Sequence, residues 1–260
     1  MKELKVSFLK AFGNLFIRAL KQSTRPLAAI LPSFFMPFFF FIVNSAGFKQ
    51  IVNLPGFNSS SYLAFYAPVA LLMAVFFTSG DAGFELMLDI TSGYFEKLLL
   101  TPSPRLAILL PRIVAMGLRA ILQAALMMLL LLLFGATFKG GIIGILFVFA
   151  LIMLFGMGWS GIGLTLAAIT KNPRVLQSSF ILVFPLTFMT TAQLPLNLLS
   201  GWYKIAVQIN PITQILEGVR VIMTRGDIYS HQVLNAFIVV VVLLIITTTA
   251  SILSFRRMAN

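Results

Sequence analysis

Long apolar runs separated by short polar breaks dominate the pattern of the chain. Stretches without a charged residue occupy residues 27–48, 50–80, 120–138, 140–170, 175–203 and 232–255. A helix needs about 20 consecutive apolar residues to cross a bilayer. The second and fifth runs are too long for one crossing, and Pro55 and Pro195 mark where each is interrupted. The pattern therefore predicts six transmembrane helices, at residues 27–48, 62–88, 106–135, 141–170, 174–193 and 232–255.

Six crossings place both termini on one side, and the basic residues indicate which side that is. With this topology, 14 of the 19 Lys and Arg residues fall on the side of the termini and 5 on the other. Cytoplasmic segments of membrane proteins carry the excess of Lys and Arg, so we predict that both termini are cytoplasmic. The first apolar run is long enough to span and lacks a small-residue cleavage site, so we expect no signal peptide.

Composition supports a multi-pass membrane protein. The 260 residues are 59% apolar and 10% charged, whereas soluble domains carry about 25% charged residues. We therefore expect an all-α protein in which residues 1–260 form one transmembrane domain. The net charge of +12 is explained by basic residues on the cytoplasmic side, and we expect no nucleic-acid partner. The absence of Cys from the sequence excludes disulfides and thiolate metal sites.

Residues 1–25 have the pattern of an amphipathic helix. Lys10, Arg18 and Lys21 fall on one face at 100° per residue, and Phe8 and Phe12 fall on the other. Such a helix lies in the membrane interface, with its apolar face in lipid and its basic face toward the headgroups. A second possible role is contact with a cytoplasmic partner.

A polar insert at residues 93–105 lies between the second and third predicted spans. It mixes charge with aromatic and leucine residues and ends at Pro102 and Pro104, which cannot continue a helix. The pattern predicts a short helix within residues 92–104, outside the hydrocarbon. This helix either docks a soluble partner or lies on lipid.

Two charged stripes flank this insert. The acidic stripe consists of Asp81, Glu85 and Asp89, and the basic stripe consists of Arg105, Arg112 and Arg119. Each stripe shares one helical face, and the two spans run antiparallel. Charges near the membrane are costly unless they are paired or reach water. Our hypothesis is that the stripes pair, with a charge swap between Glu85 and Arg112 as its test; solvated helix ends are the alternative.

Phenylalanines are concentrated in the first span, at Phe34, Phe35, Phe38, Phe39, Phe40 and Phe41. Because six such side chains surround the helix, some must face protein or a cavity. They either pack against lipid and core or form an apolar wall for a hydrophobic substrate.

Residues 194–231 are predicted to form an outer re-entrant segment with short helices. Asn210 suits a helix N-cap with Pro211 at the first helical position. Glu217 and Arg220 are three residues apart and can pair on that helix. We expect these helices to seal the outer end of the bundle.

Several functional classes have no sequence support. The chain contains no G-x-x-x-x-G-K-[ST] loop for ATP, and we find no mid-membrane carboxylate or His for proton coupling and no internal repeat typical of secondary transporters. The glycines of residues 156–163 match a dinucleotide fingerprint only formally and instead favour close helix packing. The acidic stripe is the only candidate cluster for an enzyme.

The chain resembles the membrane subunit of a type-2 ABC exporter, especially the daunorubicin-resistance type. The resemblance covers essentially the whole chain and begins with the basic amphipathic N-terminus. It is carried further by F-E-K-L-L-L-T-P at residues 95–102 followed by Arg105, by L-P-L at 194–196 with G-W at 201–202, and by N-P-I-T at 210–213 with E-G-V-R at 217–220.

The resemblance implies a partner that hydrolyses ATP. Two permease subunits, in a homodimer or heterodimer, would bind two copies of an ABC ATPase, which holds ATP and Mg. The insert would be the coupling helix, with Glu96 and Lys97 as polar contacts and Tyr94, Phe95 and Leu98 as apolar knobs. The full set of expected coupling residues is Tyr94, Phe95, Glu96, Lys97, Leu98, Thr101, Pro102 and Arg105.

The resemblance also implies a substrate path between the subunits, in the plasma (inner) membrane of a prokaryote. Its expected lining is Phe34, Phe35, Phe38, Phe41, Phe184, Thr187 and Phe188. Because the first span offers only Phe, without hydroxyls, we expect export of a drug, lipid or glycolipid that is hydrophobic or amphiphilic. A polysaccharide or glycolipid permease of the same fold and a membrane-embedded lipid-processing protein are the alternatives. The stripes, Asn210, Pro211, Glu217 and Arg220 are expected to have structural roles.

Overall fold

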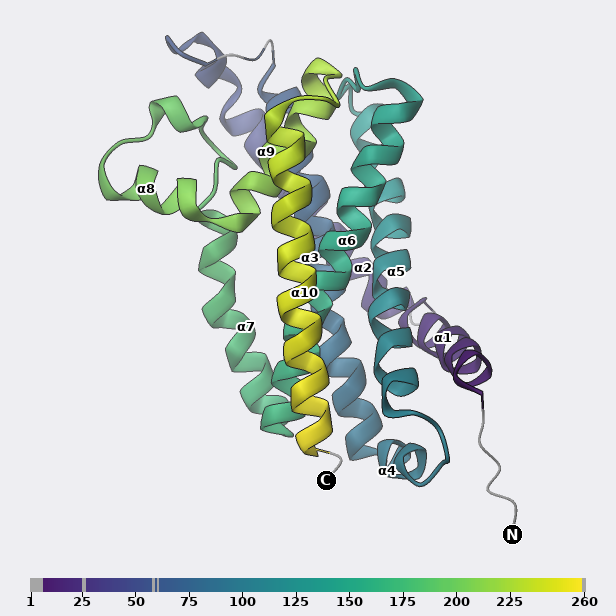
Figure 1. The fold of residues 1–260 in the computed structure, drawn as a ribbon. Helices are drawn as coiled ribbons and strands as arrows, with labels where there is room; N and C mark the ends of the chain where they lie inside the picture. The colour runs from purple at the N-terminus through teal and green to yellow at the C-terminus, as the bar shows by residue number, and fades with distance from the viewer. Residues whose placement is uncertain (1–6, 25–26, 58, 60, 259–260) are drawn as a thin grey trace.

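The computed structural model describes residues 7–24, 27–57, 59 and 61–258, and this part of the chain is all-helical (Figure 1). Its helices are α1 (Phe8–Thr24), α2 (Leu27–Gly47), η1 (Lys49–Asn53), α3 (Tyr62–Thr91), α4 (Tyr94–Leu99), α5 (Arg105–Leu133), α6 (Gly141–Thr170), α7 (Pro173–Phe188), η2 (Leu196–Leu198), α8 (Gly201–Ile209), α9 (Pro211–Arg225) and α10 (His231–Met258). The predicted all-α class is confirmed. Side chains at 27–30, 32, 179–184 and 258 lie outside the description, as do residues 1–6 and 25 of the predicted N-terminal helix.

Within the described residues, four helices are long and apolar enough to cross a membrane: α3, α5, α6 and α10. Helix α2 has 21 residues and no charged side chain, and its fully described part is the apolar stretch Ser33–Gly47. Helix α7 has 16 residues, which corresponds to about 24 Å and falls short of a hydrocarbon core of about 30 Å. The count of six crossings therefore stays a prediction.

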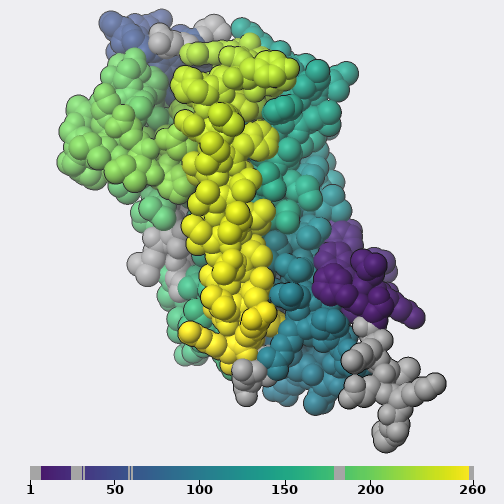
Figure 2. Space-filling model, in the orientation of Figure 1, coloured from purple at the N-terminus to yellow at the C-terminus, as the bar shows by residue number. Residues whose placement is uncertain are grey.

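Helix α3 lies at the centre of the bundle. It packs against α2, α5 and α6, and it is buried along almost its whole length. A helix that is hydrophobic on most sides lies in a protein core or in a membrane, and neighbouring helices enclose most of α3. Helix α10 lies over α6 and α9, and Figure 2 shows it running the length of one open face. Exposed Ile238, Ile245 and Ile246 make that face apolar, as contact with lipid requires.

Small residues let α6 approach two neighbours closely. A Cβ placed on Gly83 of α3 would lie 2.6 Å from the carbonyl oxygen of Gly163. On another side of α6, a Cβ on Gly161 would lie 2.8 Å from Oγ1 of Thr247 in α10. The Ser251 hydroxyl donates to the carbonyl of Gly161 over 2.7 Å. The glycines of residues 156–163 thus serve helix contacts, as small residues commonly do in membranes.

The two ends of the bundle differ in their elements. Helix α4 and the last turn of α10 lie toward one end, while η1 and α9 lie toward the other (Figure 1). Helix α1 lies across the bundle and packs against α5. This arrangement places the basic N-terminal helix and the polar insert in one half of the molecule; its orientation in a membrane stays a prediction.

Candidate functional site

Helix α4 is a six-residue helix held at one end of the bundle by its apolar side. Gly93 precedes it with a φ of 71°, a conformation that glycine adopts without steric cost. Phe95 and Leu98 are three residues apart and lie on the same face, and both are buried in a cluster with Leu86, Ile113 and Phe255. The rings of Phe95 and Phe255 meet edge to face with centroids 5.2 Å apart. Contacts from distant helices therefore fix the position of α4.

This geometry corrects the predicted role of two residues in the insert. Phe95 and Leu98, expected to be apolar knobs for a partner, are only 3% and 8% exposed. They face inward because the ends of neighbouring helices already provide an apolar surface for them. Tyr94 is half-buried, and the guanidinium of Arg18 lies 3.8 Å from its ring centroid.

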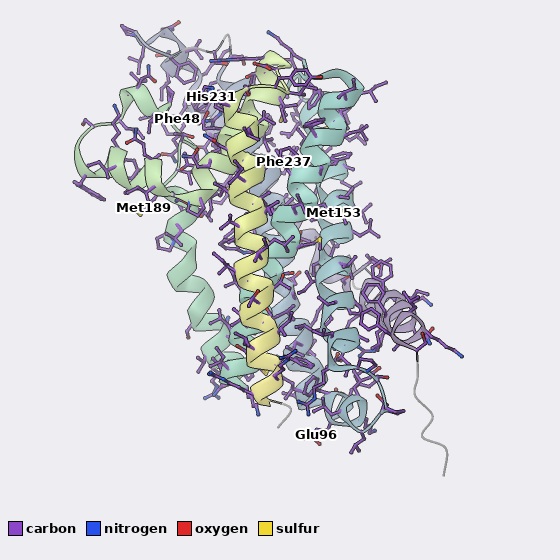
Figure 3. All side chains as sticks on the ribbon, viewed as in Figure 1. Phe48, Glu96, Met153, Met189, His231 and Phe237 are labelled. Carbon is purple, nitrogen blue, oxygen red and sulfur yellow. The ribbon has the colours of Figure 1, made fainter. Side chains whose placement is uncertain are left out.

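The outward surface of α4 and the turn after it is polar, with one exposed leucine. Its exposed residues include Glu96, Lys97, Leu100, Thr101, Pro102 and Arg105, and Leu100 is 87% exposed. Figure 3 shows Glu96 at this end of the bundle. The Thr101 hydroxyl donates to the carbonyl of Leu98 over 2.6 Å and so closes the end of α4. We call these six residues the α4 surface.

The two predicted stripes are paired in an inner charge cluster, made of Arg18, Asp81, Glu85, Asp89, Arg112 and Arg119. Asp89 accepts hydrogen bonds from Arg18 of α1, at 2.6 and 3.0 Å, and from Arg112 of α5. Arg119 contacts Asp81 at 2.9 Å and Glu85 at 3.4 Å. Pairing of the stripes is confirmed, but Glu85 faces Arg119 rather than Arg112.

The register of two antiparallel helices explains these partners. Because α3 and α5 run antiparallel, residues before Asp89 on α3 lie beside residues after Arg112 on α5. Glu85 and Asp81 therefore both lie beside Arg119. Arg105 lies in the opposite direction from Arg112, at the start of α5, and belongs to the α4 surface instead. Arg18, which the sequence reading did not include in the pairing, completes the cluster and connects α1 to α3.

Arg18 remains charged in this setting. Partial burial lowers its pKa, but the hydrogen bonds and negative charge of Asp89 outweigh burial, and the pKa of Arg18 is raised above its usual value. The cation also lies over Tyr94, which adds a cation–π contact. Through this one side chain, α1 contacts both α3 and α4.

At the other end, Glu217 and Arg220 of α9 form the predicted ion pair. Arg220 also donates to the carbonyl of Phe65 over 3.2 Å, and to the hydroxyl and carbonyl of Thr191 over 3.0 and 2.8 Å. Its guanidinium carbon lies 3.9 Å from the Phe65 ring centroid. Thr191 and Phe65 are partners that the sequence reading missed. The set therefore joins α9 to α3 and to the segment after α7.

Asn210 has more contacts than the predicted N-cap requires. Its side-chain oxygen accepts from the amide of Ile212 over 2.9 Å, with Pro211 at the first helical position, so the cap is confirmed. Its amide nitrogen donates to the carbonyls of Leu186 and Met189, both over 2.7 Å. One side chain thus satisfies the start of α9 and the end of α7.

Asn210→Ala is therefore expected to cost about 2–3 kcal/mol of unfolding free energy, from the lost cap and two unpaired carbonyls. Thermal unfolding of the purified protein in detergent measures the effect. Asn14→Ala, at an exposed position of α1, is the matched control and should change the melting temperature little. Equal shifts in the two variants would contradict the capping role.

Within the segment of residues 194–231, helix α9 packs into the bundle and does more than cover its end. Ile215, Val219 and Ile222 of α9 are fully buried and belong to the main hydrophobic core. Helix α8 differs, since Trp202 is 74% exposed. Apolar residues spaced along one face of α9 explain its burial between α3, α6 and α10.

The residues expected along a substrate path do not share one cavity in this conformation of a single chain. Phe35 is 62% exposed, whereas Phe38 packs against Phe134 at a centroid distance of 5.2 Å. Phe41 is 1% exposed and lies in the core, so here it cannot line a path. Phe34 stacks on Phe38, and Phe188 is exposed. Thr187 is buried and borders the same small pocket as Phe76. The Phe184 side chain lies outside the description.

Sequence comparisons show which known proteins this chain is similar to. The model of the ABC-2 type transporter family matches residues 10–224. The chain is 28% identical over 167 residues to the daunorubicin resistance ABC transporter permease protein DrrB1 of Streptomyces coeruleorubidus, covering 64% of this chain and 59% of that protein. It is 27% identical over 224 residues to the putative transport permease ycf38 of Cyanophora paradoxa, covering 84% and 72% of the two chains.

Proposed function

The chain belongs to the ABC-2 type transporter family, and on this premise we propose that it exports a hydrophobic or amphiphilic substrate using a separate ABC ATPase. Membership makes it the transmembrane subunit of an ABC transporter, a transport chain rather than a catalytic one. The family also implies partnership with an ABC ATPase and with another permease subunit. In our proposal two permeases, identical or different, bind two ATPases, which hold ATP and Mg.

The α4 surface is the observation that carries this proposal. It presents Glu96, Lys97 and Leu100 outward from a helix whose other side is fixed in the bundle. Because its inner side is fixed in the bundle, a force on the outward side of α4 would move the helices that it contacts as well. Closure of the ATPases on ATP would move α4, and Phe95 would pass the movement to α10 through Phe255.

The inner charge cluster would also transmit the movement of α4 to neighbouring helices. Arg18 contacts Asp89 and Tyr94, so α1 follows α3 and α4. Arg112 and Arg119 connect α3 to α5 by buried ion pairs. We place the α4 surface and both termini in the cytoplasm, at the plasma (inner) membrane of a prokaryote.

The apolar character of α2 supports the class of substrate. Phe35 and Phe39 are 62% and 48% exposed on its surface, where a second subunit or cargo can reach them. The name of the Streptomyces relative refers to daunorubicin resistance, and an amphiphilic drug fits this surface. A lipid or glycolipid has the same apolar requirement and remains within the proposal.

A lipid-processing enzyme fits the geometry less well. Its candidate carboxylates, Asp81, Glu85 and Asp89, are each within 4 Å of an arginine. These contacts engage the carboxylates in joining α3 to α1 and α5. Among the described residues, His, Asp and Glu form no group of three that could hold a metal.

The double variant Glu96→Ala/Lys97→Ala tests the docking role without disturbing the core. We expect recovery of the co-purifying ATPase to fall at least tenfold, which corresponds to about 1.4 kcal/mol of binding free energy. The melting temperature of the permease should stay unchanged because both side chains are exposed. Lys139→Ala is the control, because Lys139 is exposed and its backbone amide bonds to Met223 of α9, far from α4 in the chain. Undiminished ATPase recovery would contradict docking at the α4 surface.

A further inference from the structure

The end of the bundle opposite α4 contains a cavity of about 340 Å³. Its lining comes from α9, the first turns of α10 and the segment between α7 and α8, with further residues from α8, from the start of α3 and from the chain before it. His231 is one of the lining residues, and Figure 3 shows it at this end, far from Glu96. Pockets for small molecules have volumes of about 300–1,000 Å³, so the cavity is large enough for one small group.

Uncharged polar side chains gather in this cavity. The amide side chains are Gln208, Gln214, Gln232 and Asn235, and the hydroxyls include Thr213 and Thr224. Each amide offers both a donor and an acceptor, and each hydroxyl can act as either. Side chains of this kind match hydroxyl groups, which also donate and accept.

One of these hydroxyls has no hydrogen-bond partner among the described residues. Thr213 is 2% exposed, and its Oγ1 is buried without a hydrogen bond. A buried polar group left unpaired costs about 1–3 kcal/mol. Thr213 lines the cavity, so rotation of its side chain would bring this hydroxyl to a ligand hydroxyl, and we take the unpaired atom as a second sign of a binding site.

One ion pair lies in the wall of the cavity. Glu217 is paired with Arg220, and Arg220 is further held by Thr191 and Phe65. The further arginine of the lining, Arg225, and the imidazole of His231 are exposed. This arrangement does not concentrate cations on one point, as recognition of a phosphate would require. The lining also includes apolar Pro195, Leu196 and Val221, which suit the apolar face of a ring.

We propose that this cavity binds an uncharged group with several hydroxyls and the size of a sugar ring. The group can be a free sugar or the headgroup of a glycolipid, because both present the same chemistry. The inference concerns binding by this chain and does not depend on ATPase docking or on export. Its failure and the failure of the proposed function are therefore separate results.

The sequence contains no cysteine, so a single introduced thiol can report on occupancy. Thr224→Cys places a thiol in the cavity wall, and Tyr229→Cys places one in the loop before α10 at a position that is 90% exposed. The full chain is held in phosphatidylcholine nanodiscs, since sugar detergents would compete. The rate of modification by a small water-soluble thiol reagent is measured with methyl β-glucoside, with glucosyl-diacylglycerol, or with phosphatidylglycerol.

We expect a glucosyl probe to slow modification of Thr224→Cys at least fivefold and to leave Tyr229→Cys unaffected. Protection by methyl glucoside identifies a free sugar as sufficient, and protection by glucosyl-diacylglycerol alone identifies a lipid headgroup. Adding Gln232→Leu and Asn235→Leu should abolish protection while the melting temperature shows the fold retained. The proposal is overturned if neither glucosyl probe protects, if phosphatidylglycerol protects equally well, or if protection survives the two leucine substitutions.

Discussion

Asp89→Leu is expected to lower the free energy of unfolding by about 3–5 kcal/mol, the usual cost of leaving a buried charge without its partner. Asp89 is 4% exposed and is the acceptor for both Arg18 and Arg112. Arg18 is partly exposed and can turn toward water, whereas Arg112 is 6% exposed and cannot do so cheaply. The variant should therefore unfold at a clearly lower temperature in detergent, and α1 should become more accessible to protease.

The double variant Asp89→Leu/Arg112→Met separates lost pairing from lost packing. Replacing both members of a buried pair by apolar residues is often neutral, so most of the lost stability should return. Asp227→Leu, at an exposed loop position, is the control for adding a leucine elsewhere. A double variant no more stable than Asp89→Leu would show that the ion pair is not the source of the cost.

Gly83→Ala is expected to destabilise the bundle by more than about 3 kcal/mol, beyond the usual range for an added methyl group. Its Cβ would lie 2.6 Å from the carbonyl oxygen and 2.9 Å from the carbonyl carbon of Gly163, and both atoms belong to the backbone of α6. Relief requires α3 and α6 to separate along their contact. Thermal unfolding measures the loss, and the yield of folded protein should fall with it.

Gly117→Ala is the matched control for this prediction. Its Cβ would lie 2.5 Å from Cγ of Met157, a flexible side chain that can move aside. Alanine is also favoured over glycine in a helix by about 1 kcal/mol, which offsets part of the cost. Similar losses in both variants would indicate that the α3–α6 approach is not tighter than an ordinary contact.

Much of the fold follows from local sequence pattern. Apolar runs near 20 residues predict helices because every backbone polar group in lipid must be satisfied within its own segment. The cap at Asn210 and the pair Glu217–Arg220 lie within one helical turn, so the period of the helix alone brings their atoms together. The sequence reading placed the end of the helix containing Pro185 at residue 193, but α7 ends at Phe188.

The candidate sites were predicted less completely because they depend on how helices are rotated and aligned. The two stripes indicated pairing, but the register of α3 against α5 gave Glu85 to Arg119. The amphipathic insert indicated a helix, but the ends of neighbouring helices drew Phe95 inward and left Glu96 outside. No local pattern indicated that Arg18 would reach Asp89, 71 residues away.

The helical class, the membrane character and the residues able to form ion pairs between helices can be read from the chain, since they depend on composition and on a period of 3.6 residues. Which charges meet, which side of α4 faces outward, and that the unpaired Thr213 borders a cavity depend on the packing of distant segments. The physical reason is that a helix fixes the spacing of its own side chains, while its rotation and register are set by the surfaces of its neighbours.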